Sequence, residues 1–451
     1  MRSRPWPSIA RSSSRARPCW PHGGRCLSRW RLDPVSSPIL PAKGLQSMRI
    51  VILGAFSALY FLLMASTFNS LGQVLPMIVA DLHLTWAQAG MGFTVLGIAC
   101  GAASLVPAAV IRRFGVAVTL LAGMVQLIAG FIALAWMQGV GMYLLGTLLL
   151  GLGFCFCGTI PAVDAIGNAF EGRRSSAIGF YFTAGNIGAV TGPLTFYAIH
   201  ASTGDWRLYW LACAAGALVL GLFAAVVCGR YERMAGAIHG AAGQEGQTAS
   251  EGWSARAALG TWQFWIVVAA YTACLLINTT VHSFAYQHML EHAISPEKAT
   301  GFISAAAFVA AVAAALAGVA GQKVDARRLT VLALMGSAFS SLALVLPLSG
   351  MALGFFALTF GIGIGVSTVG TALLLRNWFG GRAGLELYSV MTVVSTSAAL
   401  GPSIGGHLHD TIGSFVPNFL GQAGIGILVA LVVGLARAPV ARGAQGDALA
   451  A

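Results

Sequence analysis

The chain has 451 residues, of which 57% are hydrophobic and only 9% are charged. A soluble domain carries roughly 25% charged residues, so this composition excludes a soluble globular protein and predicts a surface that mostly faces lipid. The formal net charge is +12. The basic residues lie at the N-terminus and between apolar segments, which argues against nucleic-acid binding.

The N-terminal stretch, residues 1–47, differs from the rest of the chain. It holds eight Arg, one Lys and a single acid, Asp33, among many Ser and Pro residues. It contains no apolar run of the length found in a signal peptide. We expect either a disordered basic extension or a start codon assigned too early, because Met48 followed by Arg49 and Ile50 is typical of a membrane-protein start.

Twelve apolar segments follow, each near the roughly 20 residues that a helix needs to cross a bilayer. They are residues 50–78, 87–111, 116–137, 141–167, 176–200, 207–228, 261–284, 299–321, 329–348, 351–375, 385–408 and 415–437. We predict a six-helix half at 48–228, a cytoplasmic central loop at 229–260, a second six-helix half at 261–437 and a cytoplasmic tail at 438–451.

The two predicted halves share sequence. The segment from Asn168 to Arg173 (NAFEGR) recurs from Asn377 to Arg382 (NWFGGR), an offset of 209 residues. Each Arg is followed nineteen residues later by Gly-Pro, at Pro193 and at Pro402. Repeats of this length in an apolar chain indicate a duplicated membrane unit. The predicted fold is therefore an all-α membrane protein with twelve transmembrane helices in two parallel six-helix repeats.

The charges separate by side of the predicted spans. From Arg49 onward, 15 basic residues fall between spans on one side, and only Arg207 and Lys298 fall on the other. The opposite side holds five acids: Asp81, Asp205, Glu291, Glu297 and Asp410. Because basic loops stay in the cytoplasm, we expect both termini to be cytoplasmic, and we expect a multi-pass protein of a bacterial inner membrane.

Two helix starts carry local signals. Thr85 with Gln88 three residues later forms a capping box, which predicts the start of the second span. Ser295, Pro296 and Glu297 combine a cap residue, a Pro at the first helical position and an acid in the first turn. This combination predicts the start of the eighth span.

Three short motifs resemble a known transporter family. They are the segment FEGRRSSAIG at 170–179, the segment GPSIGGHLHDTIG at 401–413, and Asp205-Trp206-Arg207 before the sixth span. With twelve spans and a central loop, the chain resembles the major facilitator superfamily, and its motifs resemble the monocarboxylate and oxalate/formate transporter branch. The resemblance implies alternating access between two halves, with spans 1, 2, 4, 5, 7, 8, 10 and 11 around a central pathway.

The resemblance also points to gate residues. The superfamily places an Asp before basic residues between the second and third span of each half. Asp325 keeps this pattern in the second half, whereas Arg112 replaces the Asp in the first. Arg173 belongs to the motif after the fourth span. Carriers of the branch also place a cation in the eighth or eleventh span, and these spans have none here.

Asp164 is the clearest ionisable residue inside a predicted span, about one turn from its end. An ionisable group at membrane depth is costly and is a functional candidate by default. We consider two interpretations for Asp164: a proton-binding or gating carboxylate, or an ion pair with a nearby loop Arg.

Polar side chains near the middle of the spans are candidates for substrate binding. Asn186 and Asn278 are the stronger ones, because an amide cannot be satisfied by its own helix alone. His282 could titrate or bind an anion, or it could hydrogen-bond near the outer interface. Ser367, Thr371 and Thr396 are weaker candidates, because hydroxyl groups in helices often bond back to the backbone.

The sequence thus predicts a secondary active transporter of a small carboxylate-like or polar metabolite, with a proton as the candidate coupling ion. Two alternatives stay open: an exporter of drugs or metabolites of the same superfamily, and a non-transporting membrane sensor. The Gly-rich runs lack a following Lys-Ser or Lys-Thr, which argues against nucleotide binding. We expect no enzymatic activity, no cofactor, no metal site and no nucleic-acid partner, and we expect a monomer in the lipid bilayer.

Overall fold

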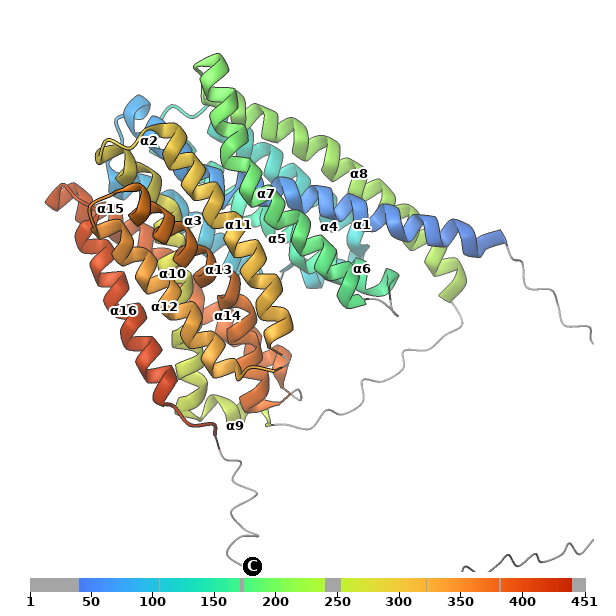
Figure 1. Ribbon diagram of the computed structural model, residues 1–451. Coiled ribbons are helices and arrows are strands. Elements are labelled where there is room, and N and C mark those ends of the chain that lie inside the picture. Colours follow the sequence, from blue (N-terminus) through green and yellow to red (C-terminus); the bar gives the residue numbers. More distant parts are fainter. Residues whose placement is uncertain are drawn as a thin grey trace, which may run out of the picture. The chain divides into compact units, whose positions relative to one another are not determined.

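The structure is a computed structural model, and it describes residues 40–104, 106–170, 174–239, 253–321, 323–380 and 383–439. Residues 1–43 and residues 44–451 form two separate units, and of the first only the start of α1 is described. The predicted N-terminal extension and C-terminal tail therefore lie largely outside the described residues. Every described element of the second unit is a helix, as the composition predicts (Figure 1).

The first half of the chain contains α1 to α8. Their bounds are α1 Leu40–Ser66, α2 Phe68–Leu82, α3 Trp86–Ala103, α4 Val106–Ala135, α5 Val140–Cys157, α6 Thr159–Ala169, α7 Arg174–Thr203 and α8 Arg207–His239.

The second half contains α9 to α16 and one 3-10 turn. Their bounds are α9 Ala255–Leu259, α10 Trp262–Glu291, α11 Pro296–Ala320, α12 Ala326–Val345, α13 Gly350–Phe379, α14 Gly384–Ser395, η2 Thr396–Ala399, α15 Leu400–Ile412 and α16 Val416–Leu435.

Among the described residues, eleven helical segments are long and apolar enough to cross a membrane. Three of them join consecutive helices: α1 with α2, α5 with α6, and α14 with α15. The remaining predicted span is α7, which has 30 residues but lower hydropathy because Asn186 and several hydroxyl residues interrupt it. With α7 included, the twelve predicted spans are present.

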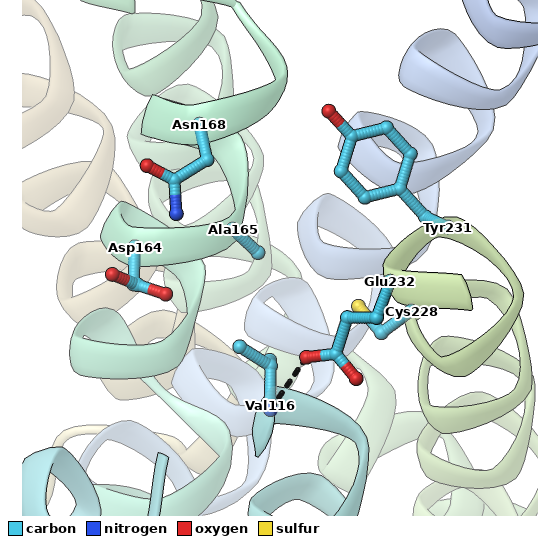
Figure 2. Close-up of a pocket in the computed structure, with 7 residues that line it drawn as sticks. All are labelled: Val116, Asp164, Ala165, Asn168, Cys228, Tyr231 and Glu232. Atoms are coloured by element: carbon cyan, nitrogen blue, oxygen red, sulfur yellow. Dashed lines mark hydrogen bonds between the residues drawn. The ribbon is translucent and has the colours of Figure 1, made fainter. Parts of the chain in front are cut away.

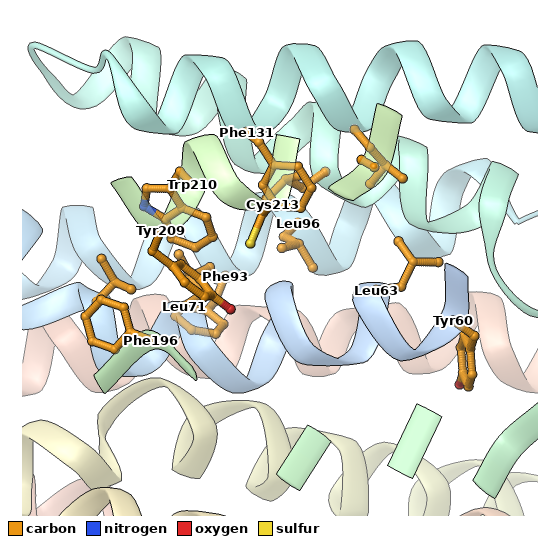
Figure 3. Packing of buried hydrophobic residues seen from close by; sticks show 14 of the residues in the cluster. Tyr60, Leu63, Leu71, Phe93, Leu96, Phe131, Phe196, Tyr209, Trp210 and Cys213 are labelled. Carbon is orange, nitrogen blue, oxygen red and sulfur yellow. The ribbon is translucent and has the colours of Figure 1, made fainter. Parts of the chain in front are cut away.

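The two halves repeat the same packing. In the first half α4 packs against α5 and α8, and in the second half α12 packs in the same way against α13 and α16. In the first half the contact between α4 and α8 is aromatic: Phe131 stacks on Trp210 with ring centroids 6.0 Å apart. Tyr209 meets Phe196 of α7 edge to face at 5.4 Å. These buried rings hold three helices together (Figure 3).

Some helix ends differ from the prediction. α4 begins before the predicted third span, but Gly115 interrupts it with φ 86°, a backbone conformation that glycine adopts without steric cost. The third span thus begins at Val116, as predicted. α8 continues to His239, beyond the predicted start of the central loop, and α9 lies inside that predicted loop.

The predicted capping box is confirmed. The Thr85 side chain accepts a hydrogen bond from the Gln88 amide, and the Gln88 side chain accepts one from the Thr85 amide. The eighth span starts at Pro296 with Glu297 in its first turn, as predicted. Ser295 occupies the N-cap position, as predicted, but its hydroxyl makes no capping hydrogen bond.

Candidate transport pathway

Three membrane segments are interrupted near their middle. α1 gives way to α2 at Thr67, whose φ of −86° and ψ of −91° are not helical. α5 gives way to α6 at Gly158, with φ −88° and ψ −134°. α14 is joined to α15 through the 3-10 turn Thr396–Ala399. Interrupted helices at mid-depth are the usual setting of transporter binding sites, because they release backbone polar groups from the helix.

Side chains donate to backbone carbonyls in the turn before Thr67. Thr67 Oγ1 donates to Leu63 O at 2.6 Å, and Ser70 Oγ donates to Ala65 O at 2.6 Å. Asn69 Nδ2 donates to Met64 O at 2.9 Å. An unpaired carbonyl inside a bilayer is costly, so this run of polar residues explains how the first span tolerates its interruption.

A proline follows the interruption in the second half. Pro402 has no N–H to donate to Ala398 O, four residues earlier. Thr279 Oγ1 of α10 lies 3.5 Å from that carbonyl and donates to it. Two turns earlier on α10, Thr272 shares a hydrogen bond of 2.8 Å with Ser395, the last residue of α14. These two hydrogen bonds hold the interrupted span against α10.

An aromatic cluster lies between α1 and α7. Tyr60 stacks on Tyr181 with ring centroids 4.4 Å apart, and Phe182 meets Tyr60 edge to face at 5.9 Å. Thr159, the residue after the Gly158 interruption, lies beside both phenols. The Tyr181 hydroxyl is buried and has no hydrogen-bond partner among the described residues.

The two predicted amides and His282 are partly buried on α7 and α10. Asn278 Oδ1 is buried and has no hydrogen-bond partner in the described part of the chain. Asn186 is half-buried on α7. The ring centroids of His282 and Phe360 are 5.1 Å apart. The backbone carbonyl of His282 is packed against Gly72 of the first half. These three side chains supply neutral hydrogen-bonding groups from both halves.

The predicted hydroxyl candidates bond to their own helices. Ser367 Oγ donates to Ile364 O at 2.8 Å, Thr371 Oγ1 to Ser367 O at 2.6 Å, and Thr396 Oγ1 to Thr392 O at 3.1 Å. Ser367 and Thr371 are also buried. Their role in substrate binding stays a prediction, and the geometry favours Asn278 over them.

The two halves meet near one end, which we call the acidic end because it holds Asp81, Asp205, Glu291, Glu297 and Asp410. The opposite, basic end holds most of the Arg and Lys residues. At the acidic end α3 packs against α15, α2 against α10, and α7 against α11. Toward the basic end the bundles diverge (Figure 1).

Hydrogen bonds between the halves reinforce this contact. Gln73 Nε2 of α2 donates to Thr300 Oγ1 of α11 at 2.7 Å, and both side chains are buried. Thr94 Oγ1 of α3 donates to Ala399 O at 2.6 Å. Tyr197 of α7 donates to Glu297 at 2.8 Å. In the described residues, every recorded hydrogen bond between the halves lies between mid-depth and the acidic end.

Asp164 lies on α6 at the basic end and is exposed. It lines a cavity of about 70 Å³ with Asn168 of α6 and with Tyr231 and Glu232 of α8 (Figure 2). No Lys or Arg pairs with Asp164 among the described residues. Arg173, the remaining gate candidate on this loop, lies outside the described residues, so the ion-pair interpretation of Asp164 stays a prediction.

The other gate candidates show how the halves differ at the basic end. Asp325 caps α12 by accepting from the Arg327 amide at 3.0 Å, and it pairs with the Arg327 side chain at 3.7 Å. Arg112, which replaces the matching acid, is exposed. Glu232 of α8 supplies the missing carboxylate, because its Oε1 accepts from the Val116 amide at 2.7 Å. Sequence reasoning missed Glu232, which is distant in the chain.

Comparisons with known proteins agree with this architecture. The chain resembles solved structures of the nucleoside transporter NupG, with a TM-score of 0.67, 12% identity and coverage of 85% of this chain and 99% of that one. A peptide transporter POT aligns with a TM-score of 0.65 and 16% identity over 87% of this chain and 93% of that one.

A POT family transporter in complex with 5-aminolevulinic acid aligns with a TM-score of 0.67 and 12% identity over 85% of this chain and 95% of that one. At these identities the likeness shows the fold alone. No curated protein matches the chain by sequence. The sequence profile of the Major Facilitator Superfamily matches residues 56–373. The profile covers most of the chain, and the protein therefore belongs to the Major Facilitator Superfamily, and with it to the secondary transporters of small solutes.

Proposed function

We propose that the protein carries a small polar organic solute that is neutral or bears one carboxylate, and that the solute binds at mid-depth between the interrupted helices. The observation that carries this proposal is the buried Asn278 Oδ1 without a partner. A buried polar atom that no protein group satisfies is costly, and a solute that donates a hydrogen bond would remove that cost.

The charge of the pathway limits the solute further. No Lys or Arg occupies the middle of any span in the described residues. A doubly charged carboxylate would therefore be transferred into the pathway without a fixed cation, which is unfavourable in a medium of low dielectric constant. The motifs at 170–179 and 401–413 support the monocarboxylate branch. We accordingly favour monocarboxylic and neutral solutes over dicarboxylates.

Orientation and coupling complete the proposal. If the basic end is cytoplasmic, as the positive-inside rule indicates, the halves are in contact on the outer side and separate toward the cytoplasm. Asp164 then faces the cytoplasmic side, where a carboxylate can exchange a proton with water. We assign Asp164 as the residue that couples a proton to transport.

The test uses the full chain reconstituted in liposomes that hold an internal pH dye. The panel contains monocarboxylates, dicarboxylates, neutral amides, nucleosides, dipeptides and cationic dyes, added one at a time. We expect internal acidification with a monocarboxylate, and we expect Asp164→Asn to abolish acidification while solute exchange continues. Glu386→Gln, which removes another exposed carboxylate near the basic end, should leave acidification unchanged. Uptake of dicarboxylates alone would contradict the proposed solute class.

An exporter of amphipathic compounds is the second candidate. The stacked Tyr60 and Tyr181 rings and the 38% exposed Phe182 favour it, because aromatic faces bind apolar and cationic rings. Cells that overproduce the protein should then resist cationic dyes and release them faster than control cells. Absence of dye efflux, together with monocarboxylate uptake in liposomes, would exclude this candidate.

A further inference from the structure

An acid recurs at the acidic end of both halves. Asp81 lies at the end of α2 and Glu291 at the end of α10. They are separated by 210 residues, within one residue of the offset between the repeated motifs. The two carboxylates therefore occupy equivalent positions, and their partners can be compared directly.

The partners of the two acids differ in kind. Asp81 Oδ2 accepts from Arg207 Nη1 at 3.0 Å and from Trp206 Nε1 at 2.9 Å. Arginine keeps its charge at every physiological pH. At an offset of 209 or 210 residues, Trp206 and Arg207 correspond to positions among Phe415, Val416 and Pro417, which offer no side-chain donor.

Glu291 is paired with a histidine instead. His409 Nε2 of α15 lies 3.1 Å from Glu291 Oε1, and Gln287 Nε2 donates to the same oxygen at 2.9 Å. An imidazole gains and loses its proton near neutral pH. The duplication thus pairs one acid with a permanent cation and the other with a group whose charge depends on pH.

His409 lies where the two halves meet. Its side chain is only 13% exposed. The His409 ring stacks on Phe415 with ring centroids 4.1 Å apart. The centroid of the Trp86 ring, from the first half, lies 5.5 Å from that of His409. The next residue, Asp410, accepts from the amides of Trp86 and Ala87 at 2.9 and 2.8 Å. We call this contact between Asp410 and the start of α3 the α3–α15 latch.

The charged and titratable groups around His409 come from two elements. α10 presents Glu291, His288 and His292, with His288 in electrostatic range of His409. Its own helix, α15, presents Asp410 and the exposed His407. α3 contributes the Trp86 ring and its N-terminal amides, and the start of α16 contributes the Phe415 ring. Neither the start of α3 nor the start of α16 adds a charged side chain.

Protonation of His409 acts against the latch. In neutral His409 the Nε2–H donates to Glu291, and Nδ1 is an acceptor that is buried without a partner among the described residues. A second proton would place an unpaired N–H at Nδ1 and a positive charge close to the N-terminus of α3, which is itself partially positive. Glu291 and His409 belong to the same half, so their attraction persists when the halves separate and favours neither state.

We propose that His409 is a proton-binding site at the acidic end whose protonation releases the α3–α15 latch. This site is distinct from Asp164 at the basic end, and it acts whatever solute is carried.

The experiment measures amide hydrogen exchange by mass spectrometry on the full chain in lipid nanodiscs, without solute. Labelling times are scaled for the intrinsic pH dependence of exchange, and a peptide from α5 serves as the internal reference. We expect protection at Trp86 and Ala87 to fall roughly tenfold between about pH 7.5 and about pH 5.5, the range in which imidazole side chains gain a proton.

His409→Gln is the decisive variant, because its amide can still donate to Glu291 but does not titrate. Protection at Trp86 and Ala87 should then be independent of pH. His407→Gln, the matched control on the exposed side of α15, should respond as the unmodified protein does. A pH response that persists in His409→Gln, or that disappears in His407→Gln, overturns the proposal.

A further variant keeps the test conclusive if His409→Gln does not fold. Glu291→Gln removes the carboxylate that favours the protonated imidazole, so the midpoint of the response should move to lower pH. An unchanged midpoint would also overturn the proposal. The readout needs no solute, so a failure of the transport assay leaves this result interpretable, and the reverse holds as well.

Discussion

At the scale of single residues, the proposed pathway rests on polar atoms that have no partner among the described residues. Most hydroxyl groups in the spans bond back to their own helix, as Thr371 does. Asn278 Oδ1 and the Tyr181 hydroxyl are buried and have no partner among the described residues. We propose that Asn278 Oδ1 and the Tyr181 hydroxyl contact the solute, because both lie beside interrupted spans.

We predict that Asn278→Ala raises the KM for transport about tenfold, the equivalent of one lost hydrogen bond of about 1.4 kcal/mol. The variant removes no hydrogen bond that the structure records for this side chain. The free energy of unfolding should therefore change by less than about 1 kcal/mol. Initial uptake rates over a range of solute concentrations, with thermal unfolding measured in parallel, give both numbers.

Thr371→Val is the matched control for this prediction. Thr371 is fully buried and its hydroxyl is already bonded to Ser367 O. Its replacement by a side chain of the same shape should leave the KM unchanged. An unaltered KM in Asn278→Ala, or an equal increase in Thr371→Val, would remove Asn278 from the binding site.

At the scale of elements, close helix contacts depend on glycine. Gly185, Gly188 and Gly192 place α7 against α1, and a Cβ at Gly188 would overlap the backbone of Phe61. Without a hydrophobic driving force between helices in lipid, such close backbone contact is a main source of helix association. Gly179 lies on the same helix but faces open space.

We predict opposite effects for two Gly→Ala substitutions on α7. Gly188→Ala should lower the free energy of unfolding by about 1–3 kcal/mol, because the added methyl group has no room. Gly179→Ala should raise it by about 0.5–1 kcal/mol, because Ala restricts the unfolded chain and meets nothing in the folded one. Thermal unfolding in the same detergent compares the two. A destabilised Gly179→Ala or a neutral Gly188→Ala would contradict the packing described for α7.

At the scale of the whole molecule, contact between the halves at the acidic end defines one state of the alternating-access cycle. A Cβ at Gly90 of α3 would overlap the Pro402 carbonyl of α15. These residues belong to different halves, so the overlap exists only while the halves are in contact. Each half should therefore fold normally with an Ala at this position.

We predict that Gly90→Ala lowers the transport rate at least about tenfold, since a bias of about 1.4 kcal/mol against one state shifts its population by that factor. Exchange protection at Trp86 and Ala87 should be lost at every pH, unlike the response through His409. Gly54→Ala, at a position with no neighbour within 4 Å, is the control and should transport normally. Normal transport by Gly90→Ala would show that this contact is not part of the cycle.

The sequence predicted the gross organisation well because its determinants are local. Each span must be long and apolar enough to cross the bilayer by itself, and a misplaced charge is costly wherever it occurs. The twelve spans, the duplication and the capping box at Thr85 could therefore be read without knowledge of any long-range contact. Candidate polar residues such as Asn278 could be named in the same way, but not ranked.

The features that need the tertiary structure all join residues distant in the chain. Glu232 caps the helix that starts at Val116, a role that the local substitution at Arg112 did not reveal. His409 meets Glu291, and Asp410 meets the start of α3. By itself the sequence determined the membrane class, the two halves and the uneven distribution of charge. Only the folded chain decided which polar atoms find partners and at which end the halves meet, because those outcomes depend on how the helices pack and not on their composition.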